Sequence, residues 1–152
     1  VLHHTQFIKR MIDDGMLRLS FTRKNISYHT PCELGRGSGI YSEPKEILRY
    51  VGRLRKNHFE DENGLCCGGS LGNMKISYSD KVLIATDAVA HLTEGDPDIL
   101  ATSCPLCKKT FASVTSTPVA DIAEIVADAI VKPVSSKLIG ESAKGRRASA
   151  IV

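Results

Sequence analysis

The stretch Ile99-Leu-Ala-Thr-Ser-Cys-Pro-Leu-Cys107 (ILATSCPLC) decides the fold, because it joins a short apolar run to two closely spaced cysteines. Residues 99–102 have the length and apolar character of a buried strand. Proline is tolerated in the first turn of a helix, so Pro105 places Cys104 at a helix N-terminus. The stretch therefore predicts a strand that ends in a cysteine loop and leads into a helix.

Two earlier parts of the chain repeat this order of strand, loop and cysteine. Residues 26–29 alternate like a short strand and lead to Cys32, which precedes a loop with three glycines. A weaker strand pattern near residues 57–60 precedes the adjacent pair Cys66 and Cys67 and a second glycine-rich loop. Because parallel strands end at the same edge of a sheet, where sites are commonly built, we expect the five cysteines to converge.

Apolar residues at helical spacing lie between these strands. The predicted helices are one that ends at Gly15, one from an N-cap at Ser42 to Gly52, one from an N-cap at Ser79 to Gly95, and one that opens at Thr117-Pro118 and ends before Pro133. The side chains expected to face the core from the third of these are Val82, Leu83, Val89 and Leu92.

Strands that alternate with helices predict an α/β fold. We expect a small, mainly parallel sheet with helices on its faces, and cysteine loops at the carboxyl ends of the strands. A single domain over residues 1–134 accounts for all of these elements. The serine, glycine and charged residues over 135–152 predict a flexible basic tail.

The composition excludes several classes of protein. With 152 residues, 42% hydrophobic and 24% charged, the chain is typical of one soluble domain. It has no apolar run of the roughly 20 residues that a transmembrane segment needs, and nothing resembles a signal peptide, so we expect a cytoplasmic protein. The net charge of +3 is small and the basic residues are scattered, which argues against a nucleic-acid partner.

The cysteines carry the chemical information in this sequence. Five of them form a poor disulfide framework and a better metal or redox set. Cys66 and Cys67 cannot easily bond to each other, because neighbouring residues form a strained disulfide ring. Gly68 and Gly69 permit a sharp bend after the pair, and their backbone amides could donate hydrogen bonds to sulfur. Adjacent cysteines then suit two different irons of one cluster better than one zinc ion.

Two other uses of the cysteines stay open at this point. Four thiolates satisfy tetrahedral zinc, so a structural zinc site in an interaction domain would use four of the five. A thiol–disulfide oxidoreductase would use Cys104 and Cys107 alone, since a helix N-terminus lowers the pKa of a CxxC pair toward thiolate. That second use leaves Cys32 and the adjacent pair without a role.

Other polar residues give weaker indications. His29 could donate a hydrogen bond to a cluster ligand or supply a proton, or simply cap the end of a strand. Arg36 could meet an anionic partner or lie at the surface. The glycine loop does not complete a GxGxxG nucleotide motif, because Ile40 stands where that motif requires glycine. The histidines without ligand spacing, expected to be solvated or partly buried, are His3, His4, His58 and His91.

The cysteine spacing resembles that of a known family, the CCG or cysteine-rich domain found in the B and D subunits of heterodisulfide reductase. Related domains occur in iron–sulfur components of glycolate oxidase and lactate-utilisation complexes. The flanks agree: Tyr28-His-Thr-Pro-Cys-Glu-Leu-Gly-Arg36 is similar to YHDPCxLGR, and Cys104-Pro-Leu-Cys107 is similar to CPxC. Val119-Ala-Asp-Ile-Ala-Glu124 resembles the stretch that closes the domain. The chain departs from the family at Thr30, where aspartate is common, and in its shorter glycine run.

The resemblance implies a set of ligands and a redox role. Its ligands would be Cys32, Cys66, Cys67, Cys104 and Cys107, holding a [4Fe-4S] cluster of the non-cubane type found in heterodisulfide reductase. Some family members bind zinc instead, and a cluster with exposed irons is readily lost in air. The implied function is electron transfer or reduction of a disulfide within a larger oxidoreductase.

The resemblance also implies missing parts. The family usually has two such motifs and often a ferredoxin-like segment, and this chain has one motif and begins at Val1. We expect an excised C-terminal repeat, whose partners are the remainder of the polypeptide or other redox subunits, and whose substrate is a disulfide or an organic acid. Such a module should not turn over alone, and a partner protein could hold it peripherally at a membrane.

Overall fold

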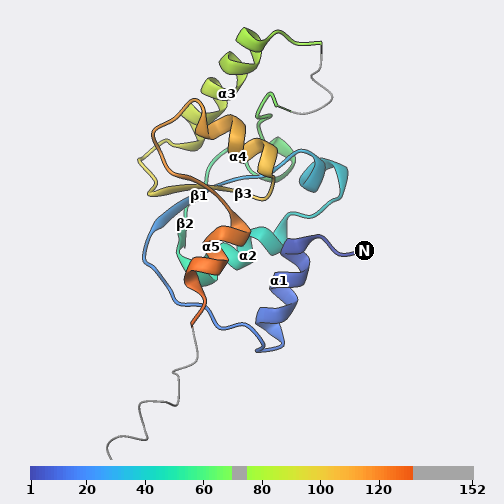
Figure 1. Cartoon of the computed structure of the whole chain (residues 1–152), viewed down its shortest axis with the longest axis vertical. Coiled ribbons are helices and arrows are strands. Elements are labelled where there is room, and N and C mark those ends of the chain that lie inside the picture. Colours follow the sequence, from blue (N-terminus) through green and yellow to red (C-terminus); the bar gives the residue numbers. More distant parts are fainter. Residues whose placement is uncertain (70–74, 132–152) are drawn as a thin grey trace, which may run out of the picture.

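The computed structural model describes residues 1–69 and 75–131, which contain one four-stranded sheet (Figure 1). Its strands, in chain order, are β1 Asn25–His29, β2 Arg53–Leu54, β3 Ile99–Thr102 and β4 Val119–Asp121. They are arranged in the order β2-β1-β3-β4 and every pairing is parallel. The predicted α/β fold with a parallel sheet is confirmed.

Five α-helices pack on the two faces of this sheet within the described residues. They are α1 His4–Asp13, α2 Ser42–Val51, α3 Tyr78–Leu92, α4 Pro105–Ala112 and α5 Ile122–Ala129. Figure 1 shows α1, α2 and α5 on one side of β1 and β3, and α3 and α4 on the other. None of these helices is long and apolar enough to cross a bilayer.

The alternation of side chains along the strands divides the core in two. Ile26 and Tyr28 of β1 point to the face covered by α2 and α5, where they pack with Ile47 and Ile122. Leu100 of β3 points to the other face and packs against α3 and α4. This second core also contains Cys67 and Cys107, so two of the cysteines belong to the packed interior.

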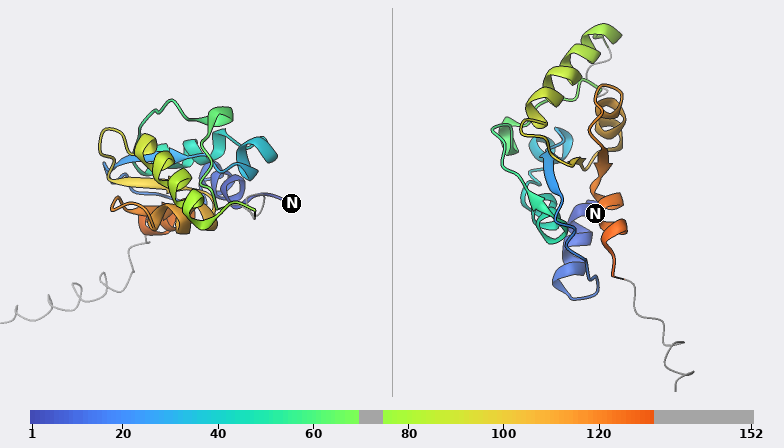
Figure 2. Two further views of the ribbon diagram at one scale, coloured as in Figure 1. Left: turned by 90° about the horizontal axis from the view of Figure 1, so that it is seen from above. Right: turned by 90° about the vertical axis from the view of Figure 1, so that its left-hand side faces the viewer.

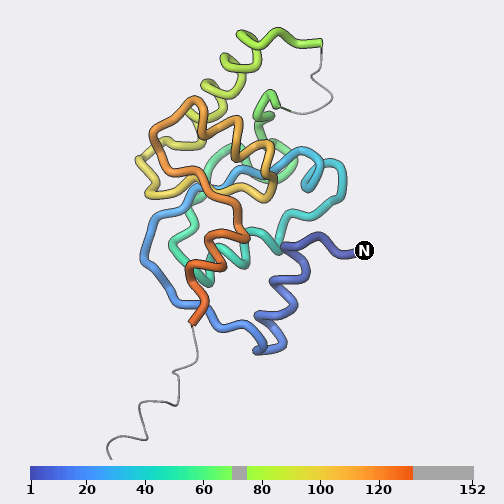
Figure 3. The backbone as a smooth tube through the Cα atoms, viewed as in Figure 1, coloured from blue at the N-terminus to red at the C-terminus, as the bar shows by residue number. Residues whose placement is uncertain are grey.

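The central strand pair brings together distant parts of the chain. Tyr28 pairs with Ala101 and His29 with Thr102, so β1 and β3 run in register to their carboxyl ends. The backbone trace in Figure 3 shows the two segments crossing the middle of the molecule side by side. The loops that carry Cys32 and Cys104 therefore leave the sheet at the same edge, as the sequence predicted.

One predicted strand and the start of one predicted helix were wrong. Residues 57–60 form no strand, and the real second strand is the two-residue β2, which follows α2 directly. Residues 119–121, expected to be helical, form β4 at the edge of the sheet, and α5 starts at Ile122. Asp121 caps this helix by accepting a hydrogen bond from Ala123 N (2.9 Å), and Glu124 reaches back to Asp121 N (2.9 Å). This capping box holds the helix start away from Pro118.

The helix ends differ slightly from those predicted. Tyr41 occupies the N-cap of α2, so Ser42 is its first residue, and Ser77 rather than Ser79 caps α3. Leu83 was expected to face inward but is 67% exposed, and the inner face of α3 is made by smaller residues such as Ala85 and Ala88. The right-hand view of Figure 2 shows why: the N-terminal half of α3 projects beyond the sheet. The predicted tail over 135–152 lies outside the described residues.

Candidate metal centre

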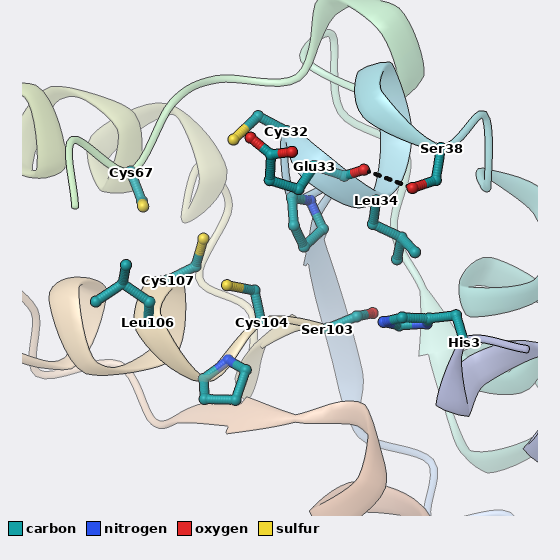
Figure 4. Close-up of a pocket in the computed structure, with 12 residues that line it drawn as sticks. His3, Cys32, Glu33, Leu34, Ser38, Cys67, Ser103, Cys104, Leu106 and Cys107 are labelled. Atoms are coloured by element: carbon teal, nitrogen blue, oxygen red, sulfur yellow. Dashed lines mark hydrogen bonds between the residues drawn. The ribbon is translucent and has the colours of Figure 1, made fainter. Parts of the chain in front are cut away.

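A pocket of about 410 Å³ lies at the carboxyl edge of the sheet. Four of the five cysteines line it, namely Cys32, Cys67, Cys104 and Cys107. Figure 4 shows their four sulfur atoms turned toward a common space, with His3 on the far side of the pocket. The remaining wall is largely apolar and is built by Pro31, Leu34, Pro105 and Leu106.

Cys32 is positioned by an unusually wound turn after β1. Residues Glu33–Gly37 form a π-helical turn, in which Gly37 N donates to Cys32 O (3.0 Å). Gly35 has no room for a side chain, because a Cβ there would lie 2.7 Å from Thr30 and 2.8 Å from Tyr41. Burial and the neighbouring Cys66 raise the pKa of the Cys32 thiol.

The adjacent pair lies in a loop that follows a short 3-10 turn at Asp61–Asn63, and no strand leads directly into it, since β2 ends at Leu54. Gly68 N lies 3.4 Å from the sulfur of Cys66, and Gly69 N lies 3.4 Å from that of Cys67. Each sulfur thus has a backbone donor two residues along the chain. Gly68 has φ +77°, a left-handed conformation that favours glycine.

The CxxC segment is placed by β3 and α4. Cys104 is the N-cap of α4 and Pro105 its first residue, as the sequence predicted. Cys107 donates a hydrogen bond to Cys67, which lowers the pKa of Cys67 to about 6 and raises that of Cys107. The helix N-terminus was expected to lower the pKa of both CxxC thiols, and for Cys107 this was wrong because its proton is shared with a thiolate across the pocket.

His29 lies behind the cysteine loop and is not among the residues that line the pocket. Its side chain is 1% exposed, and its Nε2 contacts Leu65 O at 2.9 Å. Burial lowers the pKa of His29 to about 4. His29 is therefore neutral at pH 7, and both of its ring nitrogens have hydrogen-bond partners within the protein.

Arg36 binds the chain itself. Its Nη1 donates to Gly64 O at 2.6 Å and to Glu62 O at 3.5 Å, two carbonyls of the loop that leads to Cys66. Arg36 is exposed, so the expectation of a surface arginine is confirmed, and its guanidinium is in addition bonded to this loop.

Four polar residues of the pocket wall were not assigned to the site from the sequence. They are His3, Glu33, Ser38 and Ser103. His3 also caps α1 by accepting a hydrogen bond from Thr5 N (3.3 Å), and burial lowers its pKa. No sequence signal marks His3, because only the packing of α1 against α2 brings it to the cysteines.

The spacing of the sulfur donors bears on the kind of group that this pocket can hold. Within residues 1–69 and 75–131, no three His, Cys, Asp or Glu side chains are arranged to hold one metal ion. A single zinc ion requires its sulfurs within about 3.8 Å of one another, from a Zn–S length of about 2.3 Å. A cluster of several irons takes its thiolates on different irons and thus over a wider space. The thiol-lined pocket, with backbone N–H groups aimed at two sulfurs, fits a cluster.

Comparison with known proteins places this site in a family. The family model for the cysteine-rich CCG domain matches residues 26–112, a range that contains all five cysteines. The chain is 32% identical over 138 residues to a "probable membrane-anchored ferredoxin" of Chromohalobacter salexigens, and 31% identical over 139 residues to the D subunit of the dihydromethanophenazine:CoB–CoM heterodisulfide reductase of Methanosarcina barkeri. It is 26% identical over 141 residues to a "probable iron-sulfur-binding oxidoreductase" of Bacillus subtilis.

These alignments cover 86% of this chain in each case, but only 21%, 34% and 20% of the three relatives. The chain therefore corresponds to one part of longer proteins. The matched range begins in β1 and ends with α4, so it spans every segment that contributes a cysteine to the pocket. The chain belongs to the CCG cysteine-rich domain family.

Proposed function

We propose that this chain is the iron–sulfur redox module of a larger oxidoreductase. The observation that carries this proposal is the convergence of cysteines from three separate segments on one pocket at the carboxyl edge of the sheet. The names of relatives, which include a ferredoxin, a component of a heterodisulfide reductase and an iron–sulfur oxidoreductase, support the same interpretation.

The five cysteines Cys32, Cys66, Cys67, Cys104 and Cys107 would hold the cluster. We propose a [4Fe-4S] cluster of the non-cubane type, with zinc as a substitute in a damaged sample. Such a cluster supplies one-electron transfer when bound. Cys66 and Cys67 would serve different irons, and the N–H groups of Gly68 and Gly69 would stabilise the negative charge on sulfur. The proton shared by Cys67 and Cys107 must leave on binding, so loading should release protons.

The partners in this proposal are the rest of the polypeptide or other redox subunits. The module would either pass electrons on, or act at the pocket on a disulfide or an organic acid. In each case it would work only when those other parts supply electrons. A cytoplasmic location is proposed, with a peripheral association with the membrane through a partner, since one relative is named as membrane-anchored.

Anaerobic purification and reconstitution test this function. The loaded protein should be brown, with broad visible absorbance and iron matched by acid-labile sulfide. Changing each of the five cysteines to serine in turn should lower the bound iron several-fold, while far-UV circular dichroism stays unchanged. The matched control is Ser113→Ala, which alters a small polar side chain at the end of α4, outside the cysteine pocket.

Two results would overturn the proposal. A colourless protein that holds stoichiometric zinc after anaerobic reconstitution would favour the structural zinc site. Dithiol reductase activity that survives the change of Cys32, Cys66 and Cys67 to serine would favour a thiol–disulfide enzyme working through Cys104 and Cys107.

A further inference from the structure

The loop that presents the adjacent cysteines is held by side chains rather than by a strand. Between β2 and Gly69 its described secondary structure is the single 3-10 turn at Asp61–Asn63. Two successive carbonyls just before Cys66 are nevertheless fixed: Gly64 O by Arg36 (2.6 Å) and Leu65 O by His29 (2.9 Å). These two contacts hold the backbone immediately before Cys66.

The hydrogen bonds of His29 define its protonation state. A carbonyl oxygen only accepts, so Nε2 carries the proton that is donated to Leu65. Nδ1 then accepts from the Thr102 hydroxyl at 3.1 Å. The ring of Phe111 packs against the imidazole edge at a centroid distance of 4.7 Å. With both nitrogens bonded and the ring buried, His29 has one orientation.

These contacts join all three cysteine segments. His29 lies three residues before Cys32, its Nδ1 partner Thr102 lies two residues before Cys104, and its Nε2 partner Leu65 directly precedes Cys66. Phe111 belongs to α4, the helix that carries Cys107. We propose that His29 is a positioning residue that sets the spacing of the three cysteine segments, with Arg36 as a second clamp on the Cys66 loop.

The backbone beside these clamps leaves little room for another arrangement. A Cβ on Gly64 would lie 3.1 Å from Thr30 O, so the loop runs directly against the segment between His29 and Cys32. Lys45 holds the start of the same loop through Asp61 (2.6 Å). A loop fixed at its start by Lys45 and at its end by His29 and Arg36 moves only if one of these contacts breaks.

The inference rests on the proposed cluster for its consequence, but its geometry can be tested without iron. Asparagine at position 29 keeps an atom near the place of Nδ1 and loses the donor to Leu65. Glutamine keeps a donor near the place of Nε2. His29→Asn and His29→Gln therefore differ mainly in the contact under test, and Thr102→Val removes the partner on the other side of the ring.

The first measurement is the alkylation rate of Cys66 in the metal-free full chain, followed by peptide mass spectrometry. His29→Asn and Arg36→Met should raise this rate about tenfold, the effect of losing one hydrogen bond on local opening. His29→Gln should stay within twofold of the wild type, and so should Arg49→Met, which changes an exposed arginine on α2. Wild-type rates in both His29→Asn and Arg36→Met would overturn the clamp.

The second measurement is made after anaerobic reconstitution. His29→Asn should bind several-fold less iron and shift the electron paramagnetic resonance spectrum, whereas His29→Gln should restore both. A His29→Asn protein with the wild-type iron content and spectrum would overturn the positioning role. If the wild type itself binds no iron, the proposed function fails, and the alkylation rates still decide the clamp.

Discussion

At the scale of single residues, burial decides what the polar groups near the cysteines can do. His29 is sealed between β1, β3 and α4, so its imidazole serves as a neutral donor to a carbonyl. Cys67 is also buried, yet a hydrogen bond from Cys107 favours its thiolate. The sequence identified both residues as candidates for the site. It could not predict which of two thiols keeps the proton, because that depends on a contact between residues 40 positions apart.

The buried His29 should make stability depend on pH. In the unfolded chain an imidazole takes up a proton near pH 6.5, whereas in the folded protein the pKa is about 4. The unfolded state therefore binds more protons between these values, and the free energy of unfolding should fall by about 2 kcal/mol from pH 7 to pH 5. Urea unfolding of the metal-free protein at these two pH values measures this change. His29→Gln lacks the titrating group, so its free energy of unfolding should fall by about 2 kcal/mol less than that of the wild type over the same pH range. Equal falls in the two proteins would contradict the assignment.

At the scale of elements, length and burial decide what could be predicted. The apolar run of β3 and the alternation of β1 marked both central strands, and Pro105 marked the start of α4. β2 has two residues and β4 has three, all partly or fully exposed, so neither carries a usable pattern. The π-helical turn after Cys32 was also unpredictable, since it arises from the fit of Gly35 against Thr30 and Tyr41.

The glycine bend after the adjacent cysteines should tolerate no side chain. Gly68 has φ +77°, and a Cβ there would lie 3.0 Å from Lys81 O, a backbone atom of α3. Gly68→Ala should therefore lower the free energy of unfolding by about 1–2 kcal/mol, because alanine is strained in a left-handed backbone. The new methyl group should also displace α3. The reconstituted variant should hold several-fold less iron than the wild type.

Gly15→Ala is the matched control for this change. Gly15 has φ +70°, but no atom lies within 4 Å of its Cβ position. Gly15→Ala should lower the free energy of unfolding, measured in urea, through backbone strain alone. Its iron content after reconstitution should equal that of the wild type. Equal iron contents in the two alanine variants would mean that the bend does not position the cysteines.

At the scale of the whole molecule, the sheet separates two cores that differ in cysteine content. The core under α2 and α5 contains no cysteine, whereas the core under α3 and α4 contains Cys67 and Cys107. The convergence of the cysteine loops could be predicted, because parallel strands end at a common edge. The position of α1, which brings His3 to the pocket, could not, because no local pattern encodes the contact between α1 and α2.

This division predicts different effects for two core substitutions. Ile47→Ala removes a fully buried side chain from the core without cysteines and should lower the free energy of unfolding by about 2–5 kcal/mol, a range typical of such changes. The visible absorbance of the reconstituted protein should stay unchanged. Phe111→Leu, in the core that contains Cys67 and Cys107, should alter that absorbance as well as stability. Both variants are compared by urea unfolding and by their absorbance spectra. A larger spectral change in Ile47→Ala than in Phe111→Leu would refute the division.

The strand order β2-β1-β3-β4 also governs the order of events while the chain is being made. A ribosome that has synthesised residues 1–98 has delivered Cys32, Cys66 and Cys67, but β1 still lacks its central partner. Pairings between strands so distant in sequence form late, so Cys32, Cys66 and Cys67 are synthesised before the pocket can form. A cluster that uses all five cysteines, as proposed above, could therefore assemble only after Cys104 and Cys107 have been translated.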